Sequence, residues 1–158
     1  MVYLTNLKDF NLLIATVNIK DPEDILKKKN DDIIILLDLN SVVDIEHIEE
    51  IVKQVLEAHK RGVMIAEHVE IETILRVACT NQISKAMKFA SAKRDSKAVL
   101  VILSKKEIDT GSLKLEDLEY SKERSEALIM YHNIGKDELY AMNNRLSLLL
   151  AEKANLIY

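Results

Sequence analysis

Three short apolar segments of the chain have the pattern of buried β-strands. They cover residues 11–19 (NLLIATVNI), 33–39 (IIILLDL) and 98–103 (AVLVIL), and β-branched side chains are frequent in all three. Turn-forming residues end the first segment and bound the second, which is too short for a typical helix. The sequence therefore predicts three strands of a small sheet.

Apolar residues at steps of three and four predict helices between and after these strands. Pro22 suits the first turn of a short helix that reaches Lys29, with Asp21 as its cap. A longer helix follows Asp44, whose carboxylate can accept the free amide hydrogens of the first turn, and ends at Gly62. Its apolar face consists of Ile45, Ile48, Val52, Val55, Leu56 and His59.

Four further segments have helical spacing. Residues 71–78 fit a helix, although their β-branched side chains also allow a strand. Thr80 or Asn81 can cap the helix that follows. The inner face of that helix is predicted to consist of Ile83, Ala86, Met87 and Ala90. Two helices over 121–132 and 136–156 close the chain. The last carries a stripe formed by Leu139, Met142, Leu146, Leu149 and Leu150.

The order of these elements predicts a mixed α+β (α/β) fold, with a small, mainly antiparallel sheet covered by helices. A length of 158 residues favours one domain. Three glycines and one proline indicate short connections, and no stretch has the composition of a linker. We therefore expect a single domain over residues 1–158.

The composition is that of a soluble globular protein, with 48% apolar and 30% charged residues. No apolar run approaches the ~18 residues of a membrane span. One cysteine excludes an internal disulfide and a cysteine-based zinc site, which fits a reducing compartment. The N-terminus lacks the pattern of a secretory signal. We expect a cytoplasmic protein without a membrane partner, with the nucleus an alternative in a eukaryote.

The formal net charge of −4 hides a basic segment. Residues 1–72 carry a net charge of −7, residues 73–106 of +7 and residues 107–158 of −4. The lysines can belong to solvated helix faces, or they can form a surface that binds phosphates. The eight cations of this basic segment are Arg76, Lys85, Lys88, Lys93, Arg94, Lys97, Lys105 and Lys106.

The chain offers little that indicates catalysis. Three glycines cannot form the common nucleotide-binding loops, and the acidic cluster Glu67–Glu72 lacks a recognised metal-ligand spacing. Cys79 near a helix N-terminus can have a lowered thiol pKa, but a small buried cysteine is the favoured interpretation. We therefore expect no enzyme activity, no catalytic residues, no metal and no cofactor.

The last predicted helix allows two interpretations. It can dock onto the core through its apolar stripe, or it can present an apolar patch to a partner protein through residues beside the stripe. Those residues are Leu148, Leu156, Ile157 and Tyr158. Both interpretations can hold, one for each side of the helix.

Residues 72–86 (ETILRVACTNQISKA) resemble the signature of the p53-related-kinase-binding protein family, the Cgi-type subunit of the KEOPS complex in archaea and eukaryotes. Residues 40–62, 97–103 and 131–158 are similar to that family's first long helix, a following strand and the final helix. Two positions depart from the signature. The family's glycine is Cys79 here, and its usual arginine is Asn81.

This resemblance implies a non-catalytic subunit that binds the small Bud-type kinase/ATPase of the complex. It also implies recruitment of tRNA by its 3′ CCA end for threonylcarbamoyladenosine formation beside the anticodon. We expect a monomer that joins a hetero-oligomer. The tRNA-binding residues would be Arg76, Thr80, Asn81, Gln82, Lys85 and Lys88. The kinase interface would include Leu146, Leu149, Leu150, Ala154 and Ile157.

Two alternatives come from other functional classes. The chain could be a small-molecule-binding or enzymatic domain that uses Cys79 or the Glu67–Glu72 cluster. It could also be a structural homodimer that associates through the terminal helix.

Overall fold

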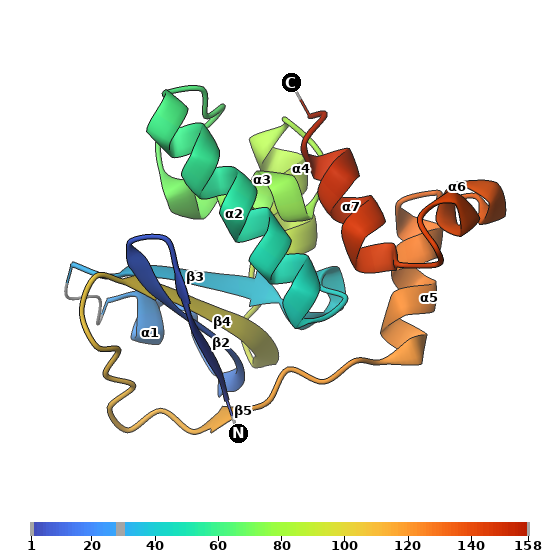
Figure 1. The fold of residues 1–158 in the computed structure, drawn as a ribbon. Coiled ribbons are helices and arrows are strands. Elements are labelled where there is room, and N and C mark those ends of the chain that lie inside the picture. The colour runs from blue at the N-terminus through green and yellow to red at the C-terminus, as the bar shows by residue number, and fades with distance from the viewer. Residues whose placement is uncertain (1, 28–30, 158) are drawn as a thin grey trace. The chain divides into compact units, whose positions relative to one another are not determined.

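The computed structural model describes residues 2–27 and 31–157, and these form a mixed α+β fold with an antiparallel sheet, as the sequence predicts (Figure 1). The strands are β1 (Tyr3–Leu7), β2 (Phe10–Ile19), β3 (Ile33–Asp38), β4 (Ser96–Ser104) and β5 (Leu115–Glu116). The helices are α1 (Glu23–Leu26), α2 (Ile45–Arg61), α3 (Val69–Val77), α4 (Ile83–Ala90), α5 (Lys122–Tyr131), α6 (Lys136–Ala141) and α7 (Leu146–Ala154). A short 3-10 helix occupies Leu39–Ser41.

The three predicted strands are β2, β3 and β4, which lie side by side in the sheet, with β3 at its edge. Its strand order is β1-β2-β4-β3, and β5 pairs with β2. β2 pairs with β4 along its length, from Asn11 opposite Ser104 to Ile19 opposite Ser96. β1 and β5 were not predicted from the sequence. β5 has only two residues, and β1 reaches β2 through a tight turn in which Lys8 has a φ of +55°.

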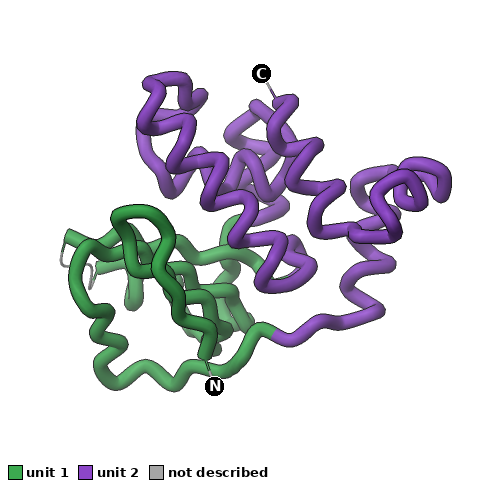
Figure 2. The backbone as a smooth tube through the Cα atoms, in the orientation of Figure 1, with its two compact units in different colours: residues 1–39, 91–118 green, residues 40–90, 119–158 purple. Residues whose placement is uncertain are grey.

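The chain divides into two compact units, coloured separately in Figure 2. Unit 1 comprises residues 1–39 and 91–118 and contains the sheet and α1. Its buried cluster joins Ile25 of α1 to one face of the sheet, including Leu13, Leu36 and Leu100. Unit 2 comprises residues 40–90 and 119–158 and contains the other six described α-helices. The single domain over 1–158 stays a prediction.

Unit 2 is built around α2. Its predicted cap is confirmed, because the Asp44 carboxylate accepts a hydrogen bond from the His47 backbone N at 2.9 Å. The predicted end is also confirmed at Gly62, which has a left-handed φ of +69°. α3 is a helix rather than a strand. α2 contacts α3 and α7, and α3 contacts α4 and α7. The segment around the α3–α4 turn is thus held on a helical scaffold.

One predicted helix, over 136–156, is wrong, because the chain breaks there into α6 and α7. Asn143 and Asn144 have φ values of +55° and +59°, and the Asn144 backbone N donates to the Leu139 carbonyl at 2.9 Å. Asparagine tolerates this left-handed conformation better than most residues. The apolar stripe did not indicate the break, because apolar residues lie at helical spacing on both sides of it.

The inner face of α4 and the start of α1 agree only in part with the sequence predictions. Ile83 was placed on the inner face of its helix, but it starts α4 and 52% of it is exposed. Ala86 and Ala90 of the predicted inner face are buried. Near the N-terminus, Asp21 accepts a hydrogen bond from the Glu23 backbone N at 3.1 Å, but the cap position of α1 is Pro22 and not the predicted Asp21. The predicted end of that helix at Lys29 lies outside the described residues.

The first turn of α2 also buries a histidine. His47 is 0% exposed, and its Nδ1 accepts a hydrogen bond from the Val43 backbone N at 3.1 Å. Burial lowers the pKa of His47 to about 4; the Asp44 carboxylate opposes this shift and His132 adds to it. The imidazole is therefore neutral in the folded protein at neutral pH.

This pKa predicts a loss of stability on mild acidification. The unfolded chain gains a proton on His47 near pH 6.5, whereas the folded protein gains it only near pH 4. The contribution of the neutral His47 side chain to the free energy of unfolding is therefore complete above pH 6.5. It is lost as the pH falls toward 4, at about 1.4 kcal/mol per pH unit. Urea unfolding at pH 7 and at pH 5 measures the difference in unfolding free energy between the two pH values. His47→Gln should narrow the difference between the two pH values; an unchanged difference would contradict the assignment.

Candidate functional site

The turn between α3 and α4 carries most of the predicted tRNA-binding residues. Cys79 adopts a φ of +53°, and the Thr80 backbone N donates to the Leu75 carbonyl at 3.2 Å, which closes the end of α3. This left-handed conformation favours glycine. A glycine, the residue that the resemblance leads us to expect at this position, would adopt this conformation with less strain than Cys79 does. Thr80 Oγ1 then accepts from the Gln82 backbone N at 3.2 Å and leads the chain into α4.

A pocket of about 520 Å³ lies beside this turn, within unit 2. The α3–α4 turn and α4 supply one part of its lining, the end of α5 a second part, and the last residues from α7 onward a third. The pocket is lined by Ala78, Cys79, Lys85, Tyr131, His132, Lys153, Leu156 and Ile157. It combines two cations, aromatic rings and apolar side chains.

An aromatic group forms part of the pocket wall. The ring of Tyr131 stacks on that of Phe89, with centroids 3.7 Å apart and planes 4° apart. His132 lies edge-on to both rings, at 5.6 Å from Phe89 and 4.9 Å from Tyr131. Tyr131 remains 45% exposed. A partly exposed ring that is held in place by a stacked neighbour can take a nucleic-acid base on its surface.

The charge of the pocket at neutral pH comes from its lysines. Burial, together with the charges of Lys153 and Lys85, lowers the pKa of His132 to about 4, so this imidazole is neutral. Among the described residues, its buried Nε2 has no hydrogen-bond partner. Lys85 and Lys153 therefore set the electrostatic preference of the pocket, which is for an anion.

Cys79 does not have the properties of a reactive thiol. Burial raises its pKa to about 11, although the charge of Lys153 opposes this shift. Its Sγ donates to the Leu150 carbonyl at 3.7 Å. The thiol is therefore protonated at neutral pH, and the suggestion of a lowered pKa is wrong because desolvation outweighs the positive charge nearby. Cys79 is a small, half-buried side chain at the pocket wall and not the buried one that the sequence predicts.

Arg76 lies inside unit 2, with 1% of its surface exposed. Its Nε and a terminal nitrogen each lie 3.1 Å from Glu72 Oε2. Its other terminal nitrogen donates to Gln54 Oε1 and to Asn155 Oδ1, both at 3.3 Å. The Glu72 carboxylate also accepts hydrogen bonds at 2.8 Å from two backbone nitrogens, those of Ile65 and Ala66. Arg76 thus connects α2, α3 and the residue that follows α7.

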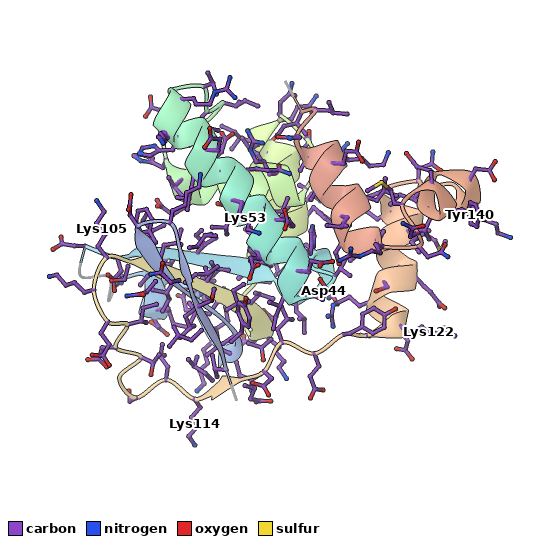
Figure 3. The ribbon with its side chains drawn as sticks, viewed as in Figure 1. Asp44, Lys53, Lys105, Lys114, Lys122 and Tyr140 are labelled. Carbon is purple, nitrogen blue, oxygen red and sulfur yellow. The ribbon has the colours of Figure 1, made fainter. Side chains whose placement is uncertain are left out.

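The basic segment divides between the two units, and part of its charge is neutralised. In unit 1, Lys93, Arg94 and Lys97 form ion pairs with Asp38, Asp21 and Glu116. Lys105, labelled in Figure 3, also belongs to unit 1, and its Nζ lies 5.7 Å from the centre of the Phe10 ring. In unit 2, Lys85 and Lys88 are exposed on α4.

Within unit 2, these two lysines are the cations of the basic segment that remain available. Neither Lys85 nor Lys88 forms an ion pair with any residue that the structure describes. The turn beside them exposes Asn81 and Gln82 and leaves Thr80 half-buried. Five of the six residues predicted to bind tRNA are therefore reachable from solvent on one segment, whereas Arg76 is not.

The residues predicted for the kinase interface point inward. Leu146, Leu149 and Leu150 belong to the buried cluster of unit 2, together with Val43 and Leu128. Ala154 and Ile157 are also buried, with 0% and 8% of their surface exposed. On the other side of this terminal segment, Leu156 is 74% exposed. The core-docking interpretation of the helix fits its stripe. The apolar patch expected beside the stripe is wrong for Ile157, which is buried, and Leu148 is half-buried; Leu156 is exposed, and Tyr158 lies outside the described residues.

Sequence reasoning missed the aromatic part of the pocket and Lys153. Phe89 of α4, which stacks on Tyr131, is far along the chain from Tyr131 and His132 at the end of α5 and from Lys153 of α7. The scarcity of aromatic residues, 4% of the chain, is the one signal that could have drawn attention to Phe89 and Tyr131.

Two other kinds of site are absent from the part of the chain that the structure describes. No helix within residues 2–27 and 31–157 combines the length and apolar character that crossing a membrane requires. The same residues contain no group of three or more histidine, cysteine or acidic side chains placed to hold a metal ion. Glu72 of the acidic cluster Glu67–Glu72 is engaged with Arg76 and the backbone.

Comparison with models of protein families matches residues 16–147 to the family described as kinase binding protein CGI-121. This match covers most of the chain and includes α2, the α3–α4 turn and the start of α7. No curated protein matches the chain.

Proposed function

The chain belongs to the CGI-121 family of kinase binding proteins, and we propose that it serves a KEOPS-type complex by holding the 3′ CCA end of tRNA while it binds the kinase. In this proposal it has no active site of its own. The kinase is of the Bud type, and the complex forms threonylcarbamoyladenosine beside the anticodon. The likeness of residues 72–86 to the KEOPS subunit signature supports the assignment, and the cytoplasm is the proposed location.

The observation that carries the tRNA part is the pocket beside the α3–α4 turn. It places the exposed ring of Tyr131 next to the ammonium groups of Lys85 and Lys153. A single-stranded RNA end presents unstacked bases and closely spaced phosphates, and proteins bind such ends by stacking on aromatic rings and by contacts from cations. The pocket offers both features within one unit.

The exposed polar residues of the turn extend this surface. Asn81 and Gln82 carry amides that can both donate to and accept from base edges. Lys88, one turn after Lys85 on α4, adds a second unpaired cation for the phosphates. Arg76 takes a different part in this proposal from the one predicted: it supports the turn and α7 from inside and does not touch RNA.

The kinase contact is proposed for the outer side of the terminal segment. The inner stripe of α7 is used by the core of unit 2. Tyr140 of α6, labelled in Figure 3, is 77% exposed, and Leu156, which also lines the pocket, is 74% exposed. These apolar side chains are suited to burial against a partner protein.

The tRNA part is tested by comparing full-length tRNA with the same tRNA lacking its CCA end. We expect the truncated tRNA to bind at least about tenfold more weakly, because loss of base stacking costs about 1–3 kcal/mol per base. A gel-shift titration at fixed salt measures both affinities. Equal affinities would place the tRNA contact away from the 3′ end.

A further inference from the structure

Lys153 is a cation of the pocket that another residue of the chain already neutralises. Its Nζ lies 2.7 Å from Oε2 of Glu138 on α6, and the two side chains are 32% and 39% exposed. Lys153 also lines the pocket together with Cys79 and Lys85. The ammonium group therefore has two possible partners: the carboxylate of Glu138 and an anion that enters the pocket.

Glu138 is held in position to make this ion pair. Its Oε1 accepts a hydrogen bond from the Gly135 backbone N at 3.4 Å, at the start of α6. The ion pair lowers the pKa of Glu138, chiefly through the hydrogen bond from Lys153, so the carboxylate stays charged at neutral pH. A phosphate that approached Lys153 would meet this negative charge and would have to displace it.

The ion pair is weak enough to be displaced. Exposed ion pairs contribute little to stability, because water screens them and both side chains lose freedom. Lys85 differs from Lys153, since it forms no ion pair with a described residue. The pocket thus contains one cation that is always available and one that becomes available only when Glu138 releases it.

We propose that Glu138 is a built-in competitor for the anion in this pocket, which limits the affinity of the pocket for the phosphates of an RNA 3′ end by occupying Lys153. The inference rests on the proposed function for the identity of the anion. It makes Glu138 a residue that sets affinity without touching the RNA. It also predicts that a change on α6, a helix that does not line the pocket, improves binding.

The test is the Glu138→Gln variant in a tRNA titration. Glutamine keeps an oxygen that can accept from the Gly135 backbone N, so the start of α6 is preserved, while the charge on Lys153 is freed. We expect tRNA to bind about two- to fivefold more tightly, which is the range that an exposed ion pair can withhold. The plot of log affinity against log salt concentration should steepen by about 0.7, the value for one additional phosphate contact on a single strand.

Two further variants separate the proposed cause from a general change in charge. Glu152→Gln removes the same charge from an exposed position next to Lys153 in the sequence, where no ion pair with a described residue is formed; it should change affinity less than Glu138→Gln does. In a Lys153→Ala background, Glu138→Gln should not increase the affinity for tRNA, because the ammonium group for which Glu138 and the phosphate compete is missing.

The outcomes separate this inference from the proposed function. If the wild type shows CCA-dependent binding but Glu138→Gln leaves the affinity unchanged or lowers it, the competition is overturned and the proposed function stands. Equal gains for Glu138→Gln and Glu152→Gln, or a gain that persists without Lys153, overturn it in the same way. If wild-type protein shows no dependence on the CCA end, both the proposed function and this inference fail.

Discussion

A protein that carries both Lys85→Glu and Lys88→Glu is expected to bind tRNA about tenfold more weakly than the wild type, or weaker still, at physiological salt. The two lysines are exposed on α4 and form no ion pair with described residues, so both are available to phosphates. Each substitution removes an attraction and adds a repulsion. The dependence of log affinity on log salt should also become shallower by about 1.4, the value for two single-strand contacts.

The matched control reverses two charges that lie away from the pocket. Lys60→Glu at the end of α2 and Lys122→Glu at the start of α5 change the net charge by the same amount, and neither residue lines the pocket. This control should keep most of the affinity and of the salt dependence. A wild-type affinity in the Lys85/Lys88 variant, or an equal loss in both variants, would remove α4 from the tRNA site.

Replacing Arg76 by methionine is expected to cost about 3–5 kcal/mol of unfolding free energy, the usual penalty for breaking a buried ion pair. The substitution leaves the Glu72 carboxylate buried without its counter-charge, although the two backbone hydrogen bonds to Glu72 remain. It also removes the link between α3 and Asn155 after α7. Urea unfolding monitored by circular dichroism measures the loss.

A second variant shows that the cost comes from the orphaned charge. Combining Arg76→Met with Glu72→Gln removes both charges, and it should recover part of the stability, because a buried neutral pair avoids the desolvation of an isolated carboxylate. At temperatures where Arg76→Met is still folded, the salt dependence of its tRNA binding should equal that of the wild type. A salt dependence reduced by one phosphate contact would instead make Arg76 part of the RNA surface.

The parts of the fold that depend on local pattern were predictable from the sequence. The strands β2, β3 and β4 each contain a run of apolar residues, and α2 is bounded by Asp44 and Gly62, residues whose capping chemistry acts within a few positions. The break between α6 and α7 was missed, because it depends on two asparagines in a left-handed conformation while the apolar spacing continues past them. A periodicity of apolar residues reports which face is buried and not whether the backbone is continuous.

The site was predictable only where it is local. The α3–α4 turn is one continuous segment, so the signature at residues 72–86 located it. Whether a charged residue is free depends on partners far away in the sequence: Arg94 pairs with Asp21, and Arg76 reaches Asn155. Lys153 lines the pocket for the same reason, since α7 folds back beside α3. Counting charges along the chain therefore located a basic segment but could not identify its available cations.

The most direct test of the proposed binding of the CCA end is a double-mutant cycle, in which one change alters the pocket and the other removes the RNA end. Wild type and Tyr131→Ala are each titrated with full-length tRNA and with tRNA lacking its CCA end. If the terminal nucleotides stack in the pocket, removal of the CCA end weakens wild-type binding by about tenfold or more and weakens binding of Tyr131→Ala much less, because the two changes delete the same contact. If removing the CCA end has the same effect on both proteins, the 3′ end does not bind in this pocket.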